Sequence, residues 1–477
     1  MNTTDIVQKL WNLCNILKDD GITYHQYVTE LTQLVFLKMA EEIGAEKRLP
    51  KDCRWKDISS LEGTALDKKY RTMLLELSNS NDKLVADIYD NAHTNIREPR
   101  HLTQLVADIN KLEWYNKNRE DFGDMYEGLL QKNANETKSG AGQYFTPRVL
   151  IKAMVTLMQP QPHEVIQDPA AGTGGFLISA FQYIKKETDN FFNLSVAEQE
   201  FLTQKAFYGV ELVPDTQRLG LMNCMLHGLE GVIELGNSLG AVGENLPPAD
   251  LILTNPPFGT KRGGGLPSRT DFTYPTSNKQ LAFLQHIYRG LKPGGRAAVV
   301  LPDNVLFEAG VGRQIRADLM NKCNLHTILR LPTGIFYAQG VKTNVLFFTR
   351  GTTDKNNTKK VWVYDLRSNM PNFGKRTLFT EKHLAGFIKA FGNKSDGSAP
   401  RKDQGEEGLF RCFDRKWIEE RNDSLDISWL KDDDQEDSAT LPEPDILARE
   451  AMLELEGAMA DLQEILLQLG FENGVAE

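Results

Sequence analysis

Between His163 and Arg350 the sequence alternates short apolar runs with helix-length segments, and this rhythm constrains the fold more than any other feature. Several runs are apolar at almost every position, as expected of strands in a sheet covered on both faces. Strands that alternate with helices form a mostly parallel, doubly wound α/β sheet. We predict seven strands, at Glu164–Gln167, Phe207–Leu212, Gly231–Leu235, Asp250–Thr254, Arg296–Leu301, His326–Leu331 and Asn344–Thr349.

The segments on either side of this region differ from it. Near the N-terminus, apolar residues such as Leu10, Leu13 and Leu17 recur at helical spacing, and strand-like alternation is scarce. The far end of the chain is acidic and then again helical. We predict three parts: an N-terminal helical domain over 1–137, the main domain over 138–430, and an acidic linker with a terminal helix over 431–477.

Composition narrows the class of protein. With 477 residues, of which 40% are hydrophobic and 25% charged, the chain is an ordinary globular protein of two or three domains. No apolar run is long enough to span a bilayer. Five scattered cysteines without a CxxC pair favour a reducing cytoplasm over a disulfide framework or a zinc knuckle. The net charge of −10 makes the chain by itself a poor binder of nucleic acid, because phosphate contacts carry much of that affinity.

A glycine-rich turn, Asp168-Pro169-Ala170-Ala171-Gly172-Thr173-Gly174-Gly175, follows the first predicted strand. Glycines let a ligand approach the backbone closely, and the helix that begins here offers N–H donors. The turn lacks the Lys and Ser/Thr of a phosphate-binding P-loop. Its Asp168 suits a cationic or hydroxyl-bearing ligand, and Glu211 ends the next strand, where nucleotide-binding sheets hold a ribose diol. The alternative is a tight strand–helix turn with a surface Glu.

The second motif, Asn255-Pro256-Pro257-Phe258, closes the apolar run Leu251–Leu253. Proline keeps the preceding residue out of helical conformations, so the Asn255 side chain and the Pro256 carbonyl are held in place. Two such acceptors can receive both N–H bonds of a planar amine and free its lone pair to attack an activated methyl group. Phe258 offers a face for stacking an extruded base. A proline-rich strand stop is the weaker alternative.

Together these motifs resemble those of amino-group methyltransferases that use S-adenosylmethionine. An N-P-P-[FY] turn downstream of D-P-x-x-G-T-G is their signature, and the order of Tyr144–Pro147, the glycine turn and Asn255–Phe258 is similar to the γ class of DNA adenine-N6 methyltransferases. The resemblance covers essentially the whole chain. It is closest to the modification subunit of type I restriction–modification systems, type IA or K-type branch, and rests further on Asp121–Arg148, Leu329–Phe348 and Asp423–Leu430.

The resemblance implies a seven-stranded Rossmann-like methyltransferase sheet with an N-terminal helical domain and a C-terminal helical tail. It implies a site-specific adenine-N6 DNA methyltransferase with S-adenosylmethionine as its cofactor. In Gly236-Asn237-Ser238-Leu239 many relatives carry an acid where this chain has Asn237, so the role of Asn237 is open. By position, the catalytic residues are Asn255, Pro256, Pro257 and Phe258, and the cofactor-binding residues are Gln143, Tyr144, Phe145, Thr146, Pro147, Arg148, Asp168, Gly172, Thr173, Gly174, Gly175, Glu211 and Asn237.

The resemblance also implies partners besides DNA. A specificity subunit would choose the target and join two copies of this chain, and a motor–nuclease subunit would convert the assembly into a restriction enzyme. The sequence itself carries no GxxxxGK[ST] loop, no metal-ligand spacing among its eight histidines and no acid-x-Lys nuclease motif after a Pro-Asp dipeptide. We therefore expect no metal, and we assign DNA translocation and cleavage to another polypeptide.

Two other functions remain open on the residues alone. The first is the same reaction on another amine, since N-P-P-[FY] enzymes also methylate glutamine amides in proteins and guanine in RNA. The second is a scaffold that binds the cofactor and clamps DNA. The helical N-terminal domain and Tyr144–Pro147 favour adenine in DNA, and the intact Asn255–Phe258 turn argues against a scaffold. Lys342-Thr343-Asn344 lines the target-base pocket or, as we favour, forms a buried strand.

The predicted terminal helix carries a heptad seam. Such a seam either packs on its own domain or docks onto another chain. The acidic run Lys431–Asp437 before it and the family resemblance favour docking onto the specificity subunit. The seam consists of Ala448, Met452, Leu455, Met459, Leu462, Leu466 and Leu469, at spacings of 4, 3, 4, 3, 4 and 3 residues.

Overall fold

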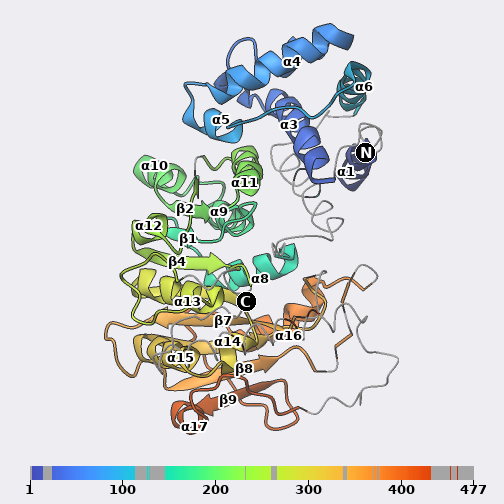
Figure 1. The fold of residues 1–477 in the computed structure, drawn as a ribbon. Coiled ribbons are helices and arrows are strands. Elements are labelled where there is room, and N and C mark those ends of the chain that lie inside the picture. Colours follow the sequence, from blue (N-terminus) through green and yellow to red (C-terminus); the bar gives the residue numbers. More distant parts are fainter. Residues whose placement is uncertain are drawn as a thin grey trace, which may run out of the picture. The chain divides into compact units, whose positions relative to one another are not determined.

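The structure is a computed structural model of the chain, in which two compact units are distinguished (Figure 1). Unit 1 comprises Met1–Ala141, Gly172–Gly174 and Val213–Leu235, and unit 2 comprises Gly142–Ala171, Gly175–Leu212 and Gly236–Glu477. The structure describes residues 3–13, 24–112, 126, 128, 146–230, 232–258, 266–336, 341–368, 370, 371, 373, 374, 377–430, 449, 452 and 459.

The regular elements described in unit 1 before residue 142 are all helices, as the apolar spacing predicts. Leu31, Leu34, Val35 and Met39 lie at helical intervals, and all four are buried in one helix. No strand occurs in the described part of the first 141 residues. The elements of unit 1 are α1 (Thr3–Asn12), α3 (Tyr24–Glu42), η1 (Ala45–Arg48), η2 (Trp55–Asp57), α4 (Gly63–Ser78), α5 (Lys83–Ile88), α6 (Pro99–Asn110), α11 (Pro214–His227) and β3 (Ile233–Leu235).

The described strands form one sheet in the order β3-β2-β1-β4-β5-β7-β6-β8-β9. Strands β2, β1, β4 and β5 run parallel, whereas β7 is antiparallel to both β5 and β6. Strand β8 is parallel to β6, and β9 is antiparallel to β8. The strands not yet bounded are β1 (Ile166–Asp168), β2 (Phe207–Glu211), β4 (Ala249–Thr254), β5 (Leu291–Pro302), β6 (Cys323–Arg330), β7 (Thr343–Arg350), β8 (Lys360–Asp365) and β9 (Phe410–Asp414).

All seven predicted runs form strands, and the α/β class is confirmed, but the predicted number of strands is wrong. Strands β8 and β9 extend the sheet beyond Gly351. Edge strand β9 is mostly only half buried, so its sequence carries no long apolar run. Strand β7 lies between β5 and β6 and is antiparallel to both, which a mostly parallel sheet did not predict.

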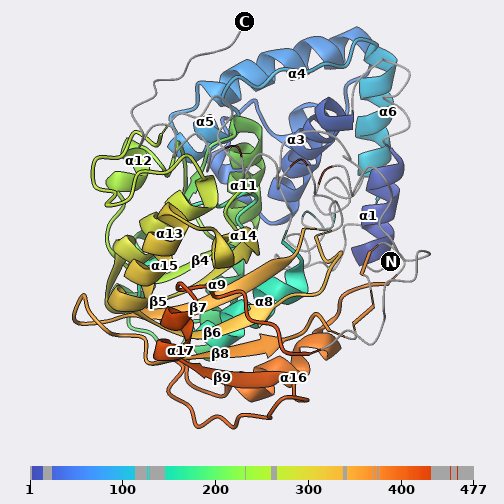
Figure 2. The same cartoon turned by 60° about the horizontal axis from the view of Figure 1, so that its bottom comes forward.

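Helices cover both faces of the sheet, which explains why its inner strands are apolar at consecutive positions (Figures 1 and 2). Phe348 of β7 belongs to the core under α13 and α15, whereas its neighbour Phe347 packs against Phe387 and Phe391 of α16. The remaining helices of unit 2 are α8 (Arg148–Met158), α9 (Gly175–Glu187), α10 (Val196–Gln204), α12 (Ala241–Glu244), α13 (Lys279–Gly290), α14 (Asn304–Phe307), α15 (Val311–Lys322), α16 (Glu381–Phe391) and α17 (Arg415–Glu420).

Candidate active site

Three of the predicted site residues lie at one edge of the sheet. Asp168 is the last residue of β1, Glu211 is the last residue of β2, and Asn255 directly follows β4. Because β1 pairs in parallel with both β2 and β4, the carboxyl ends of all three strands meet at this edge. The strand order also reverses at β1, with β2 on one side and β4 on the other. In α/β sheets, ligands bind outside the carboxyl ends at such a switch point.

Asp168 is buried, and only one of its carboxylate oxygens is paired. Its Oδ1 accepts hydrogen bonds from Thr254 Oγ1 at 2.7 Å and from the Ala170 N–H at 3.1 Å. Its Oδ2 has no partner among the described residues. Burial raises the pKa of Asp168 to about 7, with a further contribution from the Glu211 carboxylate. Since a buried unpaired carboxylate oxygen is costly, Asp168 is suited to a ligand that brings a positive charge or a hydrogen-bond donor.

The side chain of Asn255 is oriented by one specific contact. Its Nδ2 donates a hydrogen bond to Thr146 Oγ1 at 2.9 Å. Its Oδ1 is buried and has no partner in the described part of the chain. Pro256 is buried, while Phe258 is partly exposed. The amide nitrogen is thus occupied, and the amide oxygen remains available as an acceptor.

Glu211 and Asn237 are connected through one turn. The N–H of Gly236 donates to the carbonyl of Glu211 at 2.9 Å, and Asn237 Oδ1 accepts the Leu239 N–H at 2.9 Å. An Asp or Asn in this position can shape the turn in the same way, because both offer a side-chain oxygen. The side-chain oxygen of Asn237 is therefore engaged in holding the turn beside Glu211.

The sequence did not point to Arg269, which fixes the same turn from outside the predicted motifs. Its Nη1 donates to the carbonyl of Ser238 at 3.0 Å, and Ser238 Oγ donates to the carbonyl of Pro169. Asp271 receives two hydrogen bonds from Arg269, at 2.6 and 2.7 Å. Burial lowers the pKa of His286 to about 3, so its neutral ring accepts a hydrogen bond from Arg269 at 3.2 Å. Arg269 thus joins the segment after Phe258 to the Asn237 turn.

The glycine turn has the backbone that only glycine adopts readily. Gly172 and Gly174 have φ values of +55° and +81°, in the left-handed region. Within unit 1, Asn223 Nδ2 donates to the carbonyl of Thr173 at 2.9 Å. Gly175 is the first residue of α9, as the sequence predicts for a turn that opens a helix.

The remaining predicted site residues fall in two groups. Gln143, Tyr144 and Phe145 lie outside the described residues, and their placement stays a prediction. Pro147 precedes α8, and Arg148 begins it and donates to Ser179 Oγ at 3.3 Å.

Sequence reasoning also missed Thr254, the partner of Asp168. In the sequence, a threonine at the end of an apolar strand looks like one more β-branched strand residue. The role of its hydroxyl becomes visible only when the fold places it beside the Asp168 carboxylate. Lys342 directly precedes β7, and Thr343 and Asn344 begin that strand and are buried, as the favoured interpretation predicts. Their position at the end of a strand is also compatible with a place beside the target base, which stays a prediction.

The described part of the chain contains neither a metal-binding cluster nor a helix that could cross a membrane. No group of three or more His, Cys, Asp or Glu side chains there is arranged to hold a metal ion. None of the helices described has both the length and the apolar character needed to cross a membrane.

Comparison with known proteins gives two family matches. The N-6 DNA methylase family matches residues 117–437, and the HsdM N-terminal domain family matches residues 6–109. Among solved structures, the chain is similar to the crystal structure of the type I restriction enzyme EcoKI M protein, with a TM-score of 0.59 and 47% identity over 99% of this chain and 98% of that one. It is also similar to a modification subunit of a putative type I restriction enzyme from Vibrio vulnificus YJ016, with a TM-score of 0.72 and 25% identity over 86% and 93% of the two chains.

Sequence relatives lead to the same family. The methylase subunit of the type I restriction enzyme EcoKI from Escherichia coli K12 is 54% identical over 98% of this chain and 96% of its own length. The StySPI methylase subunit from Salmonella potsdam matches to the same extent, and the EcoEI methylase subunit from Escherichia coli is 32% identical over 90% of both chains. The family predicted from the motifs is confirmed: this chain belongs to the N-6 DNA methylases and, within them, to the methylase subunits of type I restriction enzymes.

Proposed function

We propose that this methylase subunit transfers the methyl group of S-adenosylmethionine to N6 of adenine in DNA, at a target that a specificity subunit selects. The observation that carries the proposal is the arrangement of Asn255, whose Nδ2 is bound to Thr146 Oγ1 while its buried Oδ1 has no partner among the described residues. A buried acceptor without a donor is costly in the unliganded protein. It is accounted for when the donor belongs to the substrate.

In this mechanism the protein acts on the amine of the base. Asn255 Oδ1 and the Pro256 carbonyl accept the two N–H bonds of the adenine amino group, which draws its nitrogen towards tetrahedral geometry and frees the lone pair. Because these acceptors gain strength as the nitrogen becomes positive, they favour the transition state over the bound substrate. Phe258 stacks on the base after it leaves the helix. When bound, S-adenosylmethionine supplies a methyl group activated by its positively charged sulfur.

The residues at the carboxyl edge fit this cofactor. Asp168 has a buried oxygen available for a hydrogen-bond donor, and Glu211 ends the next strand, where a ribose diol is bound in related sheets. The family resemblance also assigns cofactor binding to the glycine turn Gly172–Gly175 and to the segment Gln143–Arg148. Asn237 shapes the turn beside Glu211. We assign no metal to the proposed site.

Mass spectrometry of nucleosides tests the choice of substrate. Plasmid DNA incubated with the assembled complex and cofactor should accumulate N6-methyladenine. Total RNA and glutamine-containing peptides should stay unmodified under the same conditions. Methylated guanine or glutamine in place of N6-methyladenine would select one of the alternatives, and cofactor binding without any transfer would select the scaffold.

The proposed partners are DNA, a specificity subunit that joins two copies of this chain, and a motor–nuclease subunit. The net charge of −10 supports this division of labour, because such a chain is repelled by the DNA polyanion unless a partner supplies positive charge. We place the assembly in the cytoplasm, and the four described cysteines, which are all free thiols, support a reducing compartment.

The terminal heptad seam is the proposed docking element for the specificity subunit. Most of it lies outside the described residues, but Met452 and Met459, seven residues apart on the seam, are 60% and 59% exposed. Truncation after Thr440 should leave cofactor binding intact and abolish assembly in gel filtration. Normal assembly of the truncated chain would reject the docking role, and its unfolding would show that the seam packs on its own domain.

A further inference from the structure

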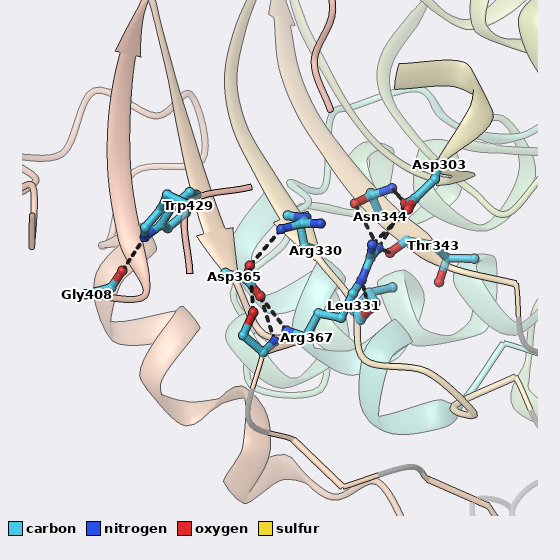
Figure 3. A network of polar contacts seen from close by, with 10 residues as sticks. Asp303, Arg330, Leu331, Thr343, Asn344, Asp365, Arg367, Gly408 and Trp429 are labelled. Atoms are coloured by element: carbon cyan, nitrogen blue, oxygen red, sulfur yellow. Dashed lines mark hydrogen bonds and ion pairs between the residues drawn. The ribbon is translucent and has the colours of Figure 1, made fainter. Parts of the chain in front are cut away.

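A second polar cluster, which has no part in the mechanism above, joins Asp303, Thr343, Asn344 and Arg367 (Figure 3). Asp303 directly follows β5, Thr343 and Asn344 begin β7, and Arg367 lies just beyond β8. The register places Leu301 opposite Asn344 and Pro302 opposite Thr343. Since β4 and β5 are parallel, these residues and Asn255 share one edge.

Arg367 ties together the segments that reach this edge. Its guanidinium donates two hydrogen bonds to the Asp303 carboxylate, at 2.8 and 2.9 Å, and others to the carbonyls of Leu331 at 3.1 Å and Thr343 at 3.2 Å. Asn344 Nδ2 donates to Asp303 Oδ1 at 2.7 Å. Although burial raises the pKa of Asp303, the bonds from Arg367 and Asn344 outweigh it and hold that pKa below its ordinary value. One side chain thus holds the segments after β5 and β6 and the start of β7.

The position of Arg367 is itself fixed. Asp365, at the end of β8, is fully buried and accepts hydrogen bonds at Oδ1 from the Arg367 N–H at 2.8 Å and the Ser368 N–H at 2.9 Å. Its Oδ2 accepts a hydrogen bond from Arg330 at 2.7 Å. The turn that carries Arg367 is therefore held in place by Asp365, and from this fixed turn the Arg367 side chain extends across the strand ends.

The cluster stands on the substrate side of the proposed site. The cofactor carboxylates Asp168 and Glu211 come from β1 and β2, whereas β5 and β7 lie beyond β4 in the other direction. Thr343 Oγ1 is buried and has no partner among the described residues. Like Asn255 Oδ1, it is therefore available to hydrogen-bond a ligand. Lys342 is exposed, and its carbonyl accepts the Asp303 N–H at 3.0 Å. A hydroxyl can bind a base or sugar edge, and an exposed lysine can bind phosphate.

We propose that Arg367 is a positioning residue for the DNA substrate: through Asp303 and Asn344 it fixes the start of β7, so that Thr343 and Lys342 contact the target nucleotide. This inference rests on the proposed transfer to a DNA base. Arg367 does not touch the reacting atoms. It acts by keeping the contact residues in place before DNA arrives, which lowers the ordering cost of binding.

Steady-state methylation kinetics of the assembled complex, with DNA as the varied substrate, test the inference. Arg367→Lys keeps the charge but has three donors in place of five, so it cannot make the two-pronged contact with the Asp303 carboxylate together with both carbonyl contacts, and Thr343→Val removes only the hydroxyl at nearly constant volume. Each should raise KM for DNA by about 3- to 10-fold, as expected for the loss of one or two hydrogen bonds. Calorimetry of the full-length chain should show unchanged affinity for S-adenosylmethionine. Thr343→Ser should restore the KM.

Arg296→Lys is the matched control. Like Arg367, Arg296 donates two hydrogen bonds to one carboxylate and one to each of two main-chain carbonyls, but it lies away from the site. It donates to the Glu164 carboxylate at 2.6 and 3.0 Å and to the carbonyls of Met158 and Gln159 at 2.7 and 2.9 Å. It should lower the melting temperature as much as Arg367→Lys does while leaving KM for DNA unchanged. A purely structural role of Arg367 predicts that the two variants behave alike.

Two results would contradict these proposals, one the role of Arg367 and the other the proposed function. Wild-type KM for DNA in both Arg367→Lys and Thr343→Val would overturn the inference while the wild-type complex still makes N6-methyladenine. Absence of N6-methyladenine with the wild-type complex would instead reject the proposed function, on which the inference rests.

Discussion

Near the amino ends of β1 and β4, Arg296 of the neighbouring strand β5 and Glu164, two residues before β1, form a buried ion pair. The Arg296 guanidinium also donates to two main-chain carbonyls. At the carboxyl ends of the same strands, Asp168 Oδ2 and Asn255 Oδ1 are buried with no partner among the described residues. Both ends are held rigidly by hydrogen bonds. At the amino ends both oxygens of the Glu164 carboxylate are hydrogen-bonded, whereas at the carboxyl ends one oxygen each of Asp168 and Asn255 has no partner among the described residues.

The difference separates polar groups that hold the fold from polar groups kept for a ligand. A saturated pair contributes to one unique arrangement of strands, whereas an unsaturated acceptor costs stability that a ligand can return on binding. Substitutions at the amino ends should therefore change stability, and substitutions at the carboxyl ends should change binding or turnover.

The largest effect is expected at the saturated end. Glu164→Ala leaves the buried guanidinium of Arg296 without its carboxylate and should lower the free energy of unfolding by about 3–5 kcal/mol. Denaturant unfolding of the full-length chain measures this change.

Turnover per folded molecule should stay near the wild-type value in the same variant at a permissive temperature. Replacing both partners, as in Glu164→Gln with Arg296→Met, should recover part of the lost stability. A specific loss of methyl transfer in folded Glu164→Ala would break the distinction between the two ends.

Asn255→Ala should have the next largest effect, this time on turnover. Removing the amide oxygen takes away an acceptor used by the reacting amine, and losses of about 100- to 1000-fold in kcat are typical of such groups. Single-turnover methylation by the assembled complex measures the loss, and calorimetry should show retained affinity for S-adenosylmethionine.

Thr146→Val sharpens the assignment because it removes only the group that holds Asn255 Nδ2. We expect a smaller loss of kcat, of about 10-fold, through misorientation of the amide. Near-normal turnover in Asn255→Ala would contradict the mechanism.

The main features of this comparison could be predicted from the sequence only at the carboxyl end. Asp168, Glu211 and Asn255 terminate apolar runs, and a parallel sheet brings such ends together. The pair Arg296–Glu164 left no local signal, because its partners are separated by more than a hundred residues and meet only in the folded sheet. Arg269 and Arg367 were missed for the same reason: a lone arginine in a polar loop looks solvated until its partners are known.

Of the two additional strands, only β9 lacked a signal in the sequence, because β8 lies between β6 and β9 and its run Val361–Tyr364 is apolar and mostly buried. An edge strand buries only part of its surface, so selection for apolar residues is weak there, and β9 depends on pairing with β8 rather than on its own pattern. By contrast, most of β4 and the second half of β5 are buried at consecutive positions and are recognisable in the sequence as continuous apolar runs.

Asp168→Asn should have an intermediate effect that depends on pH. Because the pKa of Asp168 is about 7 in the folded chain, the affinity of the wild type for the positively charged cofactor should rise with pH through 7 and then level off. At pH 8 the variant should bind S-adenosylmethionine about 10- to 100-fold more weakly, and the difference should shrink towards pH 6. Calorimetry across this range checks both the size and the pH dependence.

Stability provides the control for that variant, and its sign is opposite. A folded-state pKa above the ordinary value of 3.8 means that the folded chain holds a proton that the unfolded chain releases, so stability falls as pH rises from about 4 to 7. Asparagine carries no charge and escapes this penalty, which amounts to at most about 4 kcal/mol above pH 7. The variant should therefore be more stable than the wild type at pH 8, and a loss of stability there would indicate that Asp168 serves the fold and not the ligand.

The smallest effect is expected for Asn237→Ala. This variant tests whether Asn237 contacts the cofactor directly or only shapes the turn beside Glu211. Asn237 is exposed, and its Oδ1 is engaged with the Leu239 N–H inside its own turn. Losing that bond loosens the turn beside Glu211 and should weaken binding of S-adenosylmethionine by about 5-fold, the equivalent of one hydrogen bond. Asn237→Asp keeps the acceptor and should bind within about 3-fold of the wild type. A loss in Asn237→Ala as large as that of Asp168→Asn, without recovery in Asn237→Asp, would mean that the amide contacts the cofactor directly and belongs with Asp168 and Glu211.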